Sequence, residues 1–223
     1  MVLIFDLDDT LYDEINYVKS GFRAVAEFAS ITWAIPIEEA YTQMLETLEK
    51  MGRGYVFNEL LNRYGKLTQK NVKKCLSAYR LHQPNIQLPS SSIDCFQRFK
   101  DRPKYNVTDG NKIVQYNKVK ALGVEKYVKK AYITSRYGLK NAKPSPYCFL
   151  QIATLEKEVP KNIVYIGDNP NKDFVGIKPL GFKTIRINNG MFKDLKKEPA
   201  YQADIQINSL DELNIDLLSK LIS

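Results

Sequence analysis

A short apolar run that ends in carboxylates opens the sequence and constrains the fold most. Val2–Phe5 are four consecutive apolar residues, as in a parallel strand that is covered on both faces. Asp6 and Asp8 follow, and the two-residue period of an extended chain places them on one side, with Leu7 and Asp9 on the other. Ligands of open α/β sheets bind at the carboxyl ends of strands. Because two close carboxylates repel, the spacing predicts a site for a cation, a shared proton or a phosphate, and a helix N-cap is the alternative.

Composition narrows the class of protein. The chain has 223 residues, 44% of them hydrophobic, which suits one large domain or a domain with an insertion. The net charge of +8 is scattered along the chain, which favours small anionic ligands over nucleic acid. We expect no secretory signal and no membrane span, since the apolar stretch Phe28–Ile37 is short and interrupted. Three widely spaced cysteines, without a CxxC pair, favour a reducing, cytoplasmic setting.

The pattern of apolar residues divides the chain. From Glu14 to about Gln87 the spacing is helical throughout, with no convincing strand, and Leu88–Ser92 is a turn-rich connector. After it, short strands and helices alternate, with strands predicted at Tyr105–Thr108, Ala131–Thr134, Asn162–Ile166, Lys183–Ile187 and Asp204–Ile207, and helices at Asn111–Lys120, Pro146–Glu156 and Ser209–Ile222.

Alternation of strands and helices predicts the fold class. It is typical of an α/β protein with a three-layer, Rossmann-like core around a parallel sheet. Val2–Phe5 has no partner nearby in the sequence, so it joins this later sheet and leaves the helical segment as an insertion. We therefore predict a core from residues 1–13 and 91–223, and an inserted helical domain from residues 14–90.

Three further motifs lie at predicted strand ends. In Asn106–Gly110 a hydroxyl, Thr108, precedes a glycine that lets backbone N–H groups approach an anion, although a simple strand-to-helix turn has the same residues. Lys143 stands before Pro144 at the start of a helix, where a cation opposes the helix dipole and so needs an anionic partner, or is a surface lysine. Asp168 and Asp173 follow the strand that ends in Gly167 and suit a hard cation such as Mg²⁺, with helix capping as the alternative.

In this order, the residues resemble the motifs of the haloacid dehalogenase superfamily of phosphotransferases. Asp6, Asp8 and Thr10 match its DxDxT strand end, Thr108 its second motif, Lys143 its third, and Asp168 with Asp173 its GDxxxxD motif. The resemblance spans the chain, and the helical insertion looks like the C1 cap of the family. Two features differ: Asp109 stands where Asn is common, and the loop before Lys143 is long, so that Lys140 is a rival for the catalytic lysine.

The resemblance implies a mechanism and a cofactor. Asp6 would be the nucleophile that forms an aspartyl-phosphate, and Asp8 would carry the proton, with a raised pKa while Asp6 stays ionised. The phosphate would bind at Thr108, Asp109, Gly110 and Lys143. Mg²⁺ would be held by Asp6, Asp8 through its backbone carbonyl, Asp168 and Asp173. Thr10 and Asp9 would support the turn, and Lys19, Arg23 and Arg53 are candidate cap contacts.

The expected function is a Mg²⁺-dependent phosphatase that hydrolyses a small soluble phosphoester, a sugar phosphate or a nucleoside monophosphate. Asp8 favours phosphoester cleavage over dehalogenation, because an alkoxide leaving group needs a proton and a halide does not. A phosphomutase of the same family is the nearest alternative. A receiver-like signalling module fits the motif order poorly, and a non-catalytic phosphate-binding protein would not need every catalytic position filled. The sequence leaves the substrate and the oligomeric state open.

Overall fold

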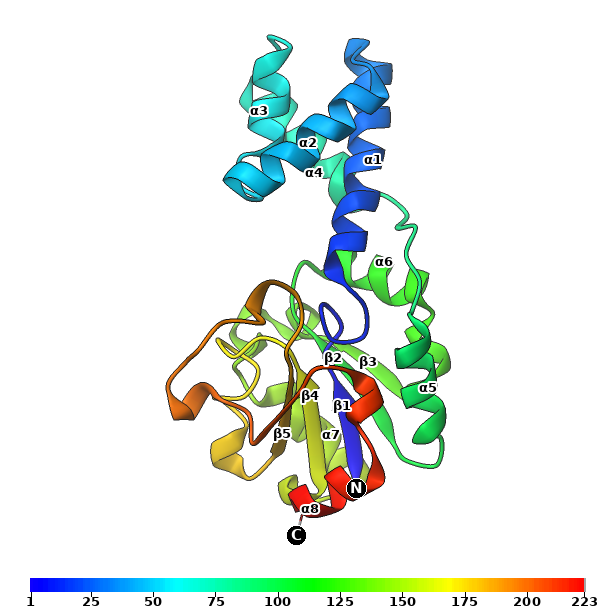
Figure 1. Ribbon diagram of the computed structural model, residues 1–223, viewed down its shortest axis with the longest axis vertical. Helices are drawn as coiled ribbons and strands as arrows, with labels where there is room; N and C mark the ends of the chain where they lie inside the picture. Colours follow the sequence, from blue (N-terminus) through cyan, green and yellow to red (C-terminus); the bar gives the residue numbers. More distant parts are fainter. Residues whose placement is uncertain (223) are drawn as a thin grey trace. The chain divides into compact units, whose positions relative to one another are not determined.

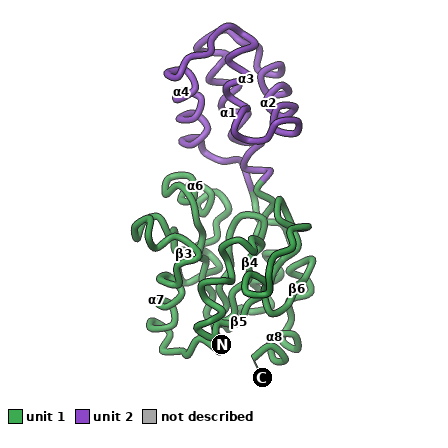
Figure 2. Tube along the Cα trace, turned by 90° about the vertical axis from the view of Figure 1, so that its left-hand side faces the viewer, with its two compact units in different colours: residues 1–14, 87–223 green, residues 15–86 purple. Residues whose placement is uncertain are grey.

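The computed structural model describes residues 1–222 and divides the chain into two compact units. One contains residues 1–14 and 87–223, and the other contains residues 15–86 (Figure 2). We predicted the division after residues 13 and 90, and the structure places it after residues 14 and 86.

The first unit is built on a six-stranded parallel sheet with the order β3-β2-β1-β4-β5-β6 (Figure 1). The strands are β1 (Val2–Phe5), β2 (Lys104–Thr108), β3 (Lys130–Ile133), β4 (Ile163–Gly167), β5 (Lys183–Ile187) and β6 (Ile205–Ile207). The predicted strands lie within one residue of these bounds. The chain therefore has the predicted α/β fold, with its first strand in the interior of the sheet.

Apolar side chains on both faces of the sheet explain its three layers. Val2 and Ile4 face one way and share a buried core with Phe149 of α7 (Tyr147–Glu156). Phe5 faces the other way and meets Phe96 of α5 (Ser90–Arg98) edge to face, with ring centroids 5.4 Å apart. Since residues on alternate sides of β1 are both buried, the strand reads as a continuous apolar run.

Strand order also fixes where a ligand can bind. The chain passes from β1 to β2 and β3 on one side of the sheet, and then crosses to β4, β5 and β6 on the other. β1 and β4 are neighbours across this reversal, with Phe5 opposite Ile166. Open α/β sheets bind ligands at the carboxyl edge of such a switch point. The residues after Phe5 and Gly167 therefore occupy the favoured position.

Two local predictions were wrong. The connector expected at residues 88–92 is in part the first turn of α5, in which the Ser92 hydroxyl donates to the Leu11 carbonyl at 2.6 Å. The single helix expected at residues 209–222 is broken into a 3-10 turn, Leu210–Glu212, and α8 (Ile215–Ile222). The break has a local cause, because the Asn214 side chain accepts from the backbone N–H of Leu217 at 2.9 Å.

Helix α6 (Lys112–Leu122) follows β2 and has clear end signals. The Asn111 side chain accepts from the backbone N–H groups of Ile113 and Val114, and Gly123 ends the helix in the left-handed conformation. Its buried residues are Gln115, Lys118, Val119 and Leu122, so that two polar side chains lie on its inner face.

The second unit consists of four helices, α1 (Glu14–Trp33, whose first residue belongs to the first unit), α2 (Ile37–Met51), α3 (Val56–Arg63) and α4 (Gln69–Leu81). Their apolar faces enclose a core of their own, which includes Phe22, Val25, Met44 and Leu60. No strand occurs among residues 15–86, as the helical spacing predicted. Within residues 1–222, none of the helices combines the length and the apolar character that a membrane span requires.

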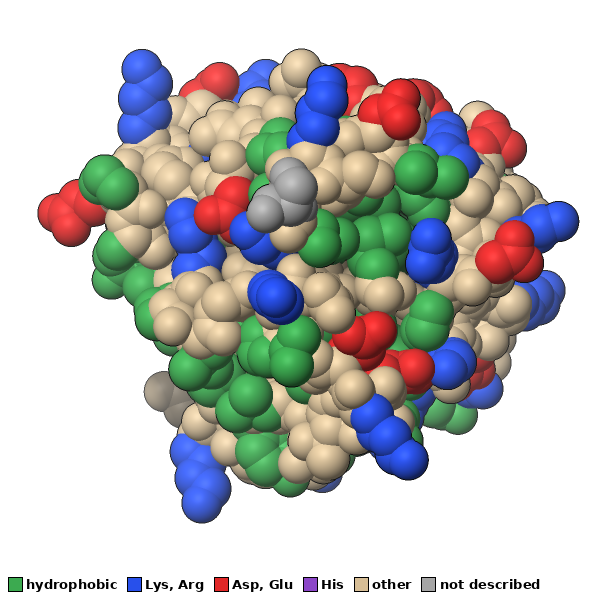
Figure 3. Space-filling model, turned by 90° about the horizontal axis from the view of Figure 1, so that it is seen from below, with side chains coloured by type: hydrophobic (Ala, Val, Ile, Leu, Met, Phe, Trp, Pro, Cys, Tyr) green, Lys and Arg blue, Asp and Glu red, His purple; other side chains and the backbone are tan. Residues whose placement is uncertain are grey.

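The surface charge is dispersed where Figure 3 displays it. On the face seen there, the Lys and Arg side chains stand singly or in small groups among acidic and apolar side chains. The positive net charge of +8 is therefore not gathered into a stripe on this face.

Candidate active site

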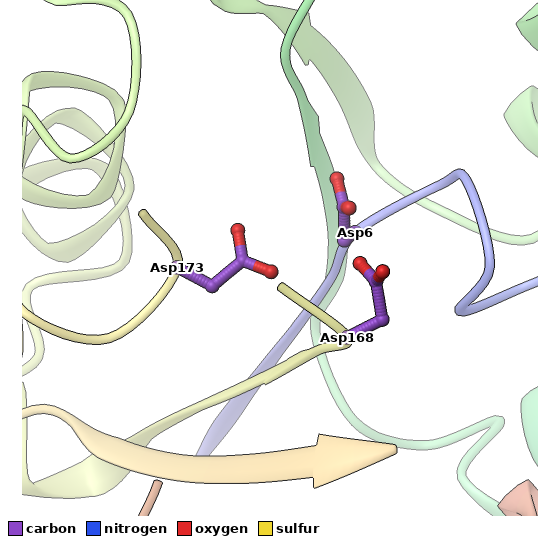
Figure 4. A group of neighbouring side chains, drawn as sticks. All are labelled: Asp6, Asp168 and Asp173. Carbon is purple, nitrogen blue, oxygen red and sulfur yellow. The ribbon is translucent and has the colours of Figure 1, made fainter. Parts of the chain in front are cut away.

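Three carboxylates converge at the switch point of the sheet. Asp6 follows β1, Asp168 follows β4, and Asp173 lies in the next turn (Figure 4). One oxygen from each lies within 4.8 Å of the others, and all three residues are buried. Gly167 makes this approach possible, because a Cβ there would lie 2.6 Å from an Asp173 carboxylate oxygen. The fold thus gathers three of the predicted acids in one place.

A single buried lysine joins two of these acids. The Lys143 ammonium donates to Asp6 Oδ1 at 2.9 Å, to Asp173 Oδ1 at 2.7 Å and to the Tyr165 hydroxyl at 2.8 Å. Its segment packs tightly on the loop after Asp173, since a Cβ on Gly176 would lie 1.7 Å from the Pro144 carbonyl oxygen. Lys140 lies exposed in the 3-10 helix before it. The structure therefore brings Lys143, rather than its rival, to the acids.

The acids outnumber the cation, and their protonation reflects this. Burial raises the pKa of the Asp6 carboxyl to about 6. The charge of Lys143 opposes this shift, and the charge of Asp173 adds to it. Burial, together with the charges of Asp173 and Asp6, raises the pKa of Asp168 to about 9. Three carboxylates around one ammonium leave an uncompensated negative charge in a buried place.

This donor set fits a divalent metal ion. Carboxylate oxygens are the ligands that Mg²⁺ prefers, and a second positive charge would balance the acids that Lys143 leaves unpaired. Asp6, Asp168 and Asp173 are therefore suited to hold such an ion.

The end of β2 and the loop after it line a second part of the site. Thr108 ends β2 and is buried, and its hydroxyl accepts from the Gln115 side-chain amide at 2.9 Å. The Asp109 carboxylate accepts from the Thr134 hydroxyl and, at 3.2 Å, from the Lys143 backbone N–H. Asp109, which differs from the family pattern, therefore ties the lysine segment to β2. Gly110 has a φ of 143°, which favours glycine.

Asp8 lies in a different environment from Asp6. Its Oδ1 accepts from the Lys118 ammonium at 2.8 Å and from the Tyr12 hydroxyl at 2.7 Å, and its Oδ2 accepts from the Gln115 amide at 2.8 Å. Burial acts to raise the pKa of Asp8, but the charge and hydrogen bond of Lys118, helped by Gln115 and Tyr12, hold it below its usual value.

The predicted pKa of Asp8 was therefore wrong. We expected a raised pKa for Asp8, with Asp6 ionised. The structure gives the opposite order of pKa values. At Asp8 the charge and hydrogen bond of Lys118, with Gln115 and Tyr12, outweigh burial, whereas at Asp6 burial and the charge of Asp173 outweigh Lys143.

The turn after β1 is held by residues outside the acid cluster. Asp9 adopts a positive φ of 53°, and its carboxylate accepts from the Glu14 backbone N–H at 2.8 Å. Thr10 is buried in the same turn.

In the helical unit, the Arg23 guanidinium pairs with the Glu38 carboxylate at 2.5 Å.

Four residues that contact the acids were not predicted from the sequence: Lys118, Gln115, Tyr12 and Tyr165. Lys118 and Gln115 could have been recognised from their spacing, because they share the inner face of α6 with Val119 and Leu122. Polar residues on an otherwise apolar stripe indicate buried partners. Tyr12 and Tyr165 carry no such signal, since tyrosines in a turn and in a strand are common.

Comparisons with known proteins agree with this geometry. Among curated proteins, a glyceraldehyde 3-phosphate phosphatase from Methanocaldococcus jannaschii is 29% identical over 237 residues, covering 98% of this chain and 97% of that protein. A protein of the same name from Methanopyrus kandleri is 27% identical over 221 residues, covering 94% of this chain and 92% of that protein.

Solved structures show the same fold. A haloacid dehalogenase superfamily hydrolase of subfamily IA from Geobacter sulfurreducens matches with a TM-score of 0.67 at 14% identity, over 97% of this chain and 95% of that one. A related hydrolase from Bacillus subtilis, solved with bound magnesium, matches with a TM-score of 0.64 at 19% identity, over 99% of this chain and 97% of that one. The model of the haloacid dehalogenase-like hydrolase family matches residues 1–181. As its motifs predicted, the chain belongs to the haloacid dehalogenase-like hydrolases.

Proposed function

We propose that this chain is a Mg²⁺-dependent phosphatase that hydrolyses a small sugar phosphate. The observation that carries the proposal is the buried group of Asp6, Asp168 and Asp173 with Lys143 bonded to two of the three acids. Three buried carboxylates need more positive charge than one lysine supplies. A carboxylate nucleophile can approach a phosphate only when cations offset the negative charge of the phosphate.

Asp6 is the proposed nucleophile. One carboxylate oxygen attacks phosphorus in line with the ester oxygen, so that the P–O bond of the ester breaks as an aspartyl-phosphate forms. Water then attacks the same phosphorus, releases inorganic phosphate and restores the Asp6 carboxylate. Lys143, 2.9 Å from Asp6 Oδ1, would hold this carboxylate in place and offset the charge that gathers on the phosphoryl oxygens.

Asp8 is the proposed proton carrier. It would protonate the leaving ester oxygen in the first half of the reaction and deprotonate the attacking water in the second. Its position two residues after Asp6 supports this role. In the metal-free chain Lys118 holds the pKa of Asp8 below its usual value, so the carboxylate is suited to the deprotonation step and must take up a proton before it can serve the leaving oxygen.

The remaining site residues receive supporting roles. Thr108, Gly110 and Lys143 would bind the oxygens of the phosphate, with Asp109 holding the lysine segment to β2 through its bond to the Lys143 N–H. Asp6, Asp168 and Asp173 with the Asp8 carbonyl would hold Mg²⁺, which when bound supplies positive charge against the phosphate oxygens.

The helical unit, residues 15–86, is the proposed C1 cap, the part of such enzymes that selects the substrate. The substrate class follows from the curated relatives, which carry the name glyceraldehyde 3-phosphate phosphatase. We therefore expect a three-carbon sugar phosphate to be the best substrate of a panel. The free, buried state of Cys75, Cys95 and Cys148 supports a cytoplasmic location.

Phosphate release from a panel of triose, pentose and hexose phosphates and nucleoside monophosphates tests the proposal. We expect Mg²⁺-dependent turnover that EDTA abolishes and that falls at least ~10³-fold in Asp6→Asn and in Asp8→Asn. Asp101→Asn is the matched control, because Asp101 is exposed at the opposite end of β2 and should leave turnover unchanged. Full activity of Asp6→Asn would refute the nucleophile. An isomeric phosphate without free phosphate would identify a phosphomutase instead.

A further inference from the structure

We propose that Lys118 of α6 is a positioning residue, which fixes the carboxylate of Asp8 for proton transfer to the leaving group. The inference rests on the proposed function, in which Asp8 carries the proton. It adds a residue outside the sequence motifs, and it predicts for which substrates that residue matters.

The contacts of Lys118 are unusual for a lysine. Its side chain is only 3% exposed, and its ammonium lies 2.8 Å from Asp8 Oδ1 and 3.1 Å from Glu14 Oε1. Removing an ammonium from water is costly, and it is offset only when well-placed acids take its protons. The chain therefore maintains a buried cation on a helix face that it shares with Val119 and Leu122.

Asp8 is held at both oxygens. Lys118 and the Tyr12 hydroxyl donate to Oδ1, and the Gln115 amide donates to Oδ2. Three donors from two segments leave the carboxylate little freedom to rotate. A proton carrier must lie within hydrogen-bond reach of the atom it serves, and a displacement of about 1 Å can cost on the order of 10²-fold in rate.

The same helix face also contacts the phosphate side of the site. The Gln115 amide reaches Thr108 Oγ1 at 2.9 Å and the Asp109 carbonyl at 2.7 Å, in addition to Asp8. Gln115 and Lys118 are three residues apart, so they lie on one side of α6. Helix α6 thus fixes the position of the Asp8 side chain relative to the end of β2.

A purely structural role is the competing interpretation, because Lys118 also pairs with Glu14 at the start of α1. The two interpretations differ in how the loss depends on the leaving group. A misplaced proton carrier slows an alkyl phosphate, whose alkoxide needs a proton, more than an aryl phosphate, whose phenolate leaves readily. A general loss of stability slows both alike.

The test compares kcat and KM for glyceraldehyde 3-phosphate and for p-nitrophenyl phosphate with Mg²⁺. In Lys118→Met we expect kcat to fall on the order of 10–100-fold on the sugar phosphate and by less than about threefold on p-nitrophenyl phosphate, with KM changed by less than about threefold. Lys118→Arg, which keeps a donor and the charge, should recover part of the loss. Lys120→Met on the exposed face of the same helix is the matched control and should resemble wild type.

If Lys118→Met does not fold, Tyr12→Phe is a milder variant that tests the same inference. It removes only the hydroxyl that donates to Asp8 and should show the same leaving-group dependence at smaller amplitude. Equal losses on the two substrates, or no loss, in folded variants would overturn the inference while wild-type turnover upholds the proposed function. A wild-type protein without turnover on any phosphoester would overturn the proposed function and, with it, this role of Lys118.

Discussion

Replacing Asp168 by asparagine should stabilise the metal-free protein and remove its response to Mg²⁺. In the folded chain, burial and the charges of Asp173 and Asp6 raise the pKa of Asp168 from 3.8 to about 9. At pH 7 this side chain therefore takes up a proton when the chain folds. At about 1.4 kcal/mol per pH unit, the uptake costs about 4 kcal/mol.

Asparagine has nearly the same shape and needs no proton. Its amide still loses hydrogen bonds to water on burial, which offsets part of the gain. We therefore expect Asp168→Asn to raise the free energy of unfolding in EDTA by roughly 1–3 kcal/mol. Wild type should gain about 2.7 kcal/mol from Mg²⁺ at 100 times its Kd, whereas the variant should gain almost nothing.

Urea unfolding at pH 7, followed by circular dichroism in EDTA and in MgCl₂, measures both effects. Asp173→Asn is the informative contrast, because its carboxylate accepts from Lys143 at 2.7 Å and from the Asn169 backbone N–H at 2.9 Å. Asparagine keeps only one of these two acceptor oxygens and loses the charge that faces Lys143, which should destabilise the metal-free protein by about 2–3 kcal/mol. An Asp168→Asn protein that is less stable than wild type in EDTA, or that keeps the full Mg²⁺ response, would contradict our account of the acid cluster.

Three further predictions follow from the buried polar groups. Lys143→Met removes the ammonium that pairs with Asp6 and Asp173, and it should lower the free energy of unfolding in EDTA by roughly 3–5 kcal/mol, with partial recovery in MgCl₂. An unchanged urea midpoint would contradict a stabilising role of these ion pairs. The free energy of unfolding of the wild type in EDTA should fall as the pH rises from 6 to 8. Asp6 and Asp168 have raised pKa values, about 6 and about 9, and therefore bind more protons in the folded chain than in the unfolded one. A urea midpoint that rises over this range would contradict the prediction. Ser92→Ala should cost about 1–3 kcal/mol and leave kcat unchanged, because it strips the Leu11 carbonyl of a buried partner; a loss below ~0.5 kcal/mol by thermal unfolding would mean that water replaces the hydroxyl.

Two acids of the candidate site, Asp6 and Asp168, were predictable because each directly follows a strand. A buried strand is visible as an apolar run, and the residue after it lies at the carboxyl edge whatever the rest of the fold does. Asp6 and Asp168 could thus be assigned to one edge of the sheet from the sequence alone, whereas Lys143, which stands before α7, was assigned through the family motif. The order of the strands was not needed for this step.

The surroundings of Asp8 could not be predicted in this way. Lys118 and Gln115 reach Asp8 from a helix more than a hundred residues later in the chain, and only the tertiary structure brings them together. The protonation of an acid depends on such partners, which is why the predicted order of Asp6 and Asp8 was wrong.

Helix α5 was missed for a different reason. Ser90–Ser92 suit a turn as well as they suit the first turn of a helix, since serine side chains satisfy backbone groups in both. Burial of Cys95 and Phe96 against the sheet decides in favour of the helix, and that burial is a tertiary effect.

The position of β1 has a consequence for synthesis of the chain. β1 pairs with β2 through Lys104–Asn106 and with β4 through Ile163–Ile166, and both partners are made long after it. Until then four apolar residues, Val2–Phe5, have no sheet to join, and contacts this distant in sequence slow folding. Asp6, the proposed nucleophile, likewise precedes its ion-pair partner Lys143 by 137 residues. The acid cluster therefore cannot assemble until synthesis has passed β4 and Asp173.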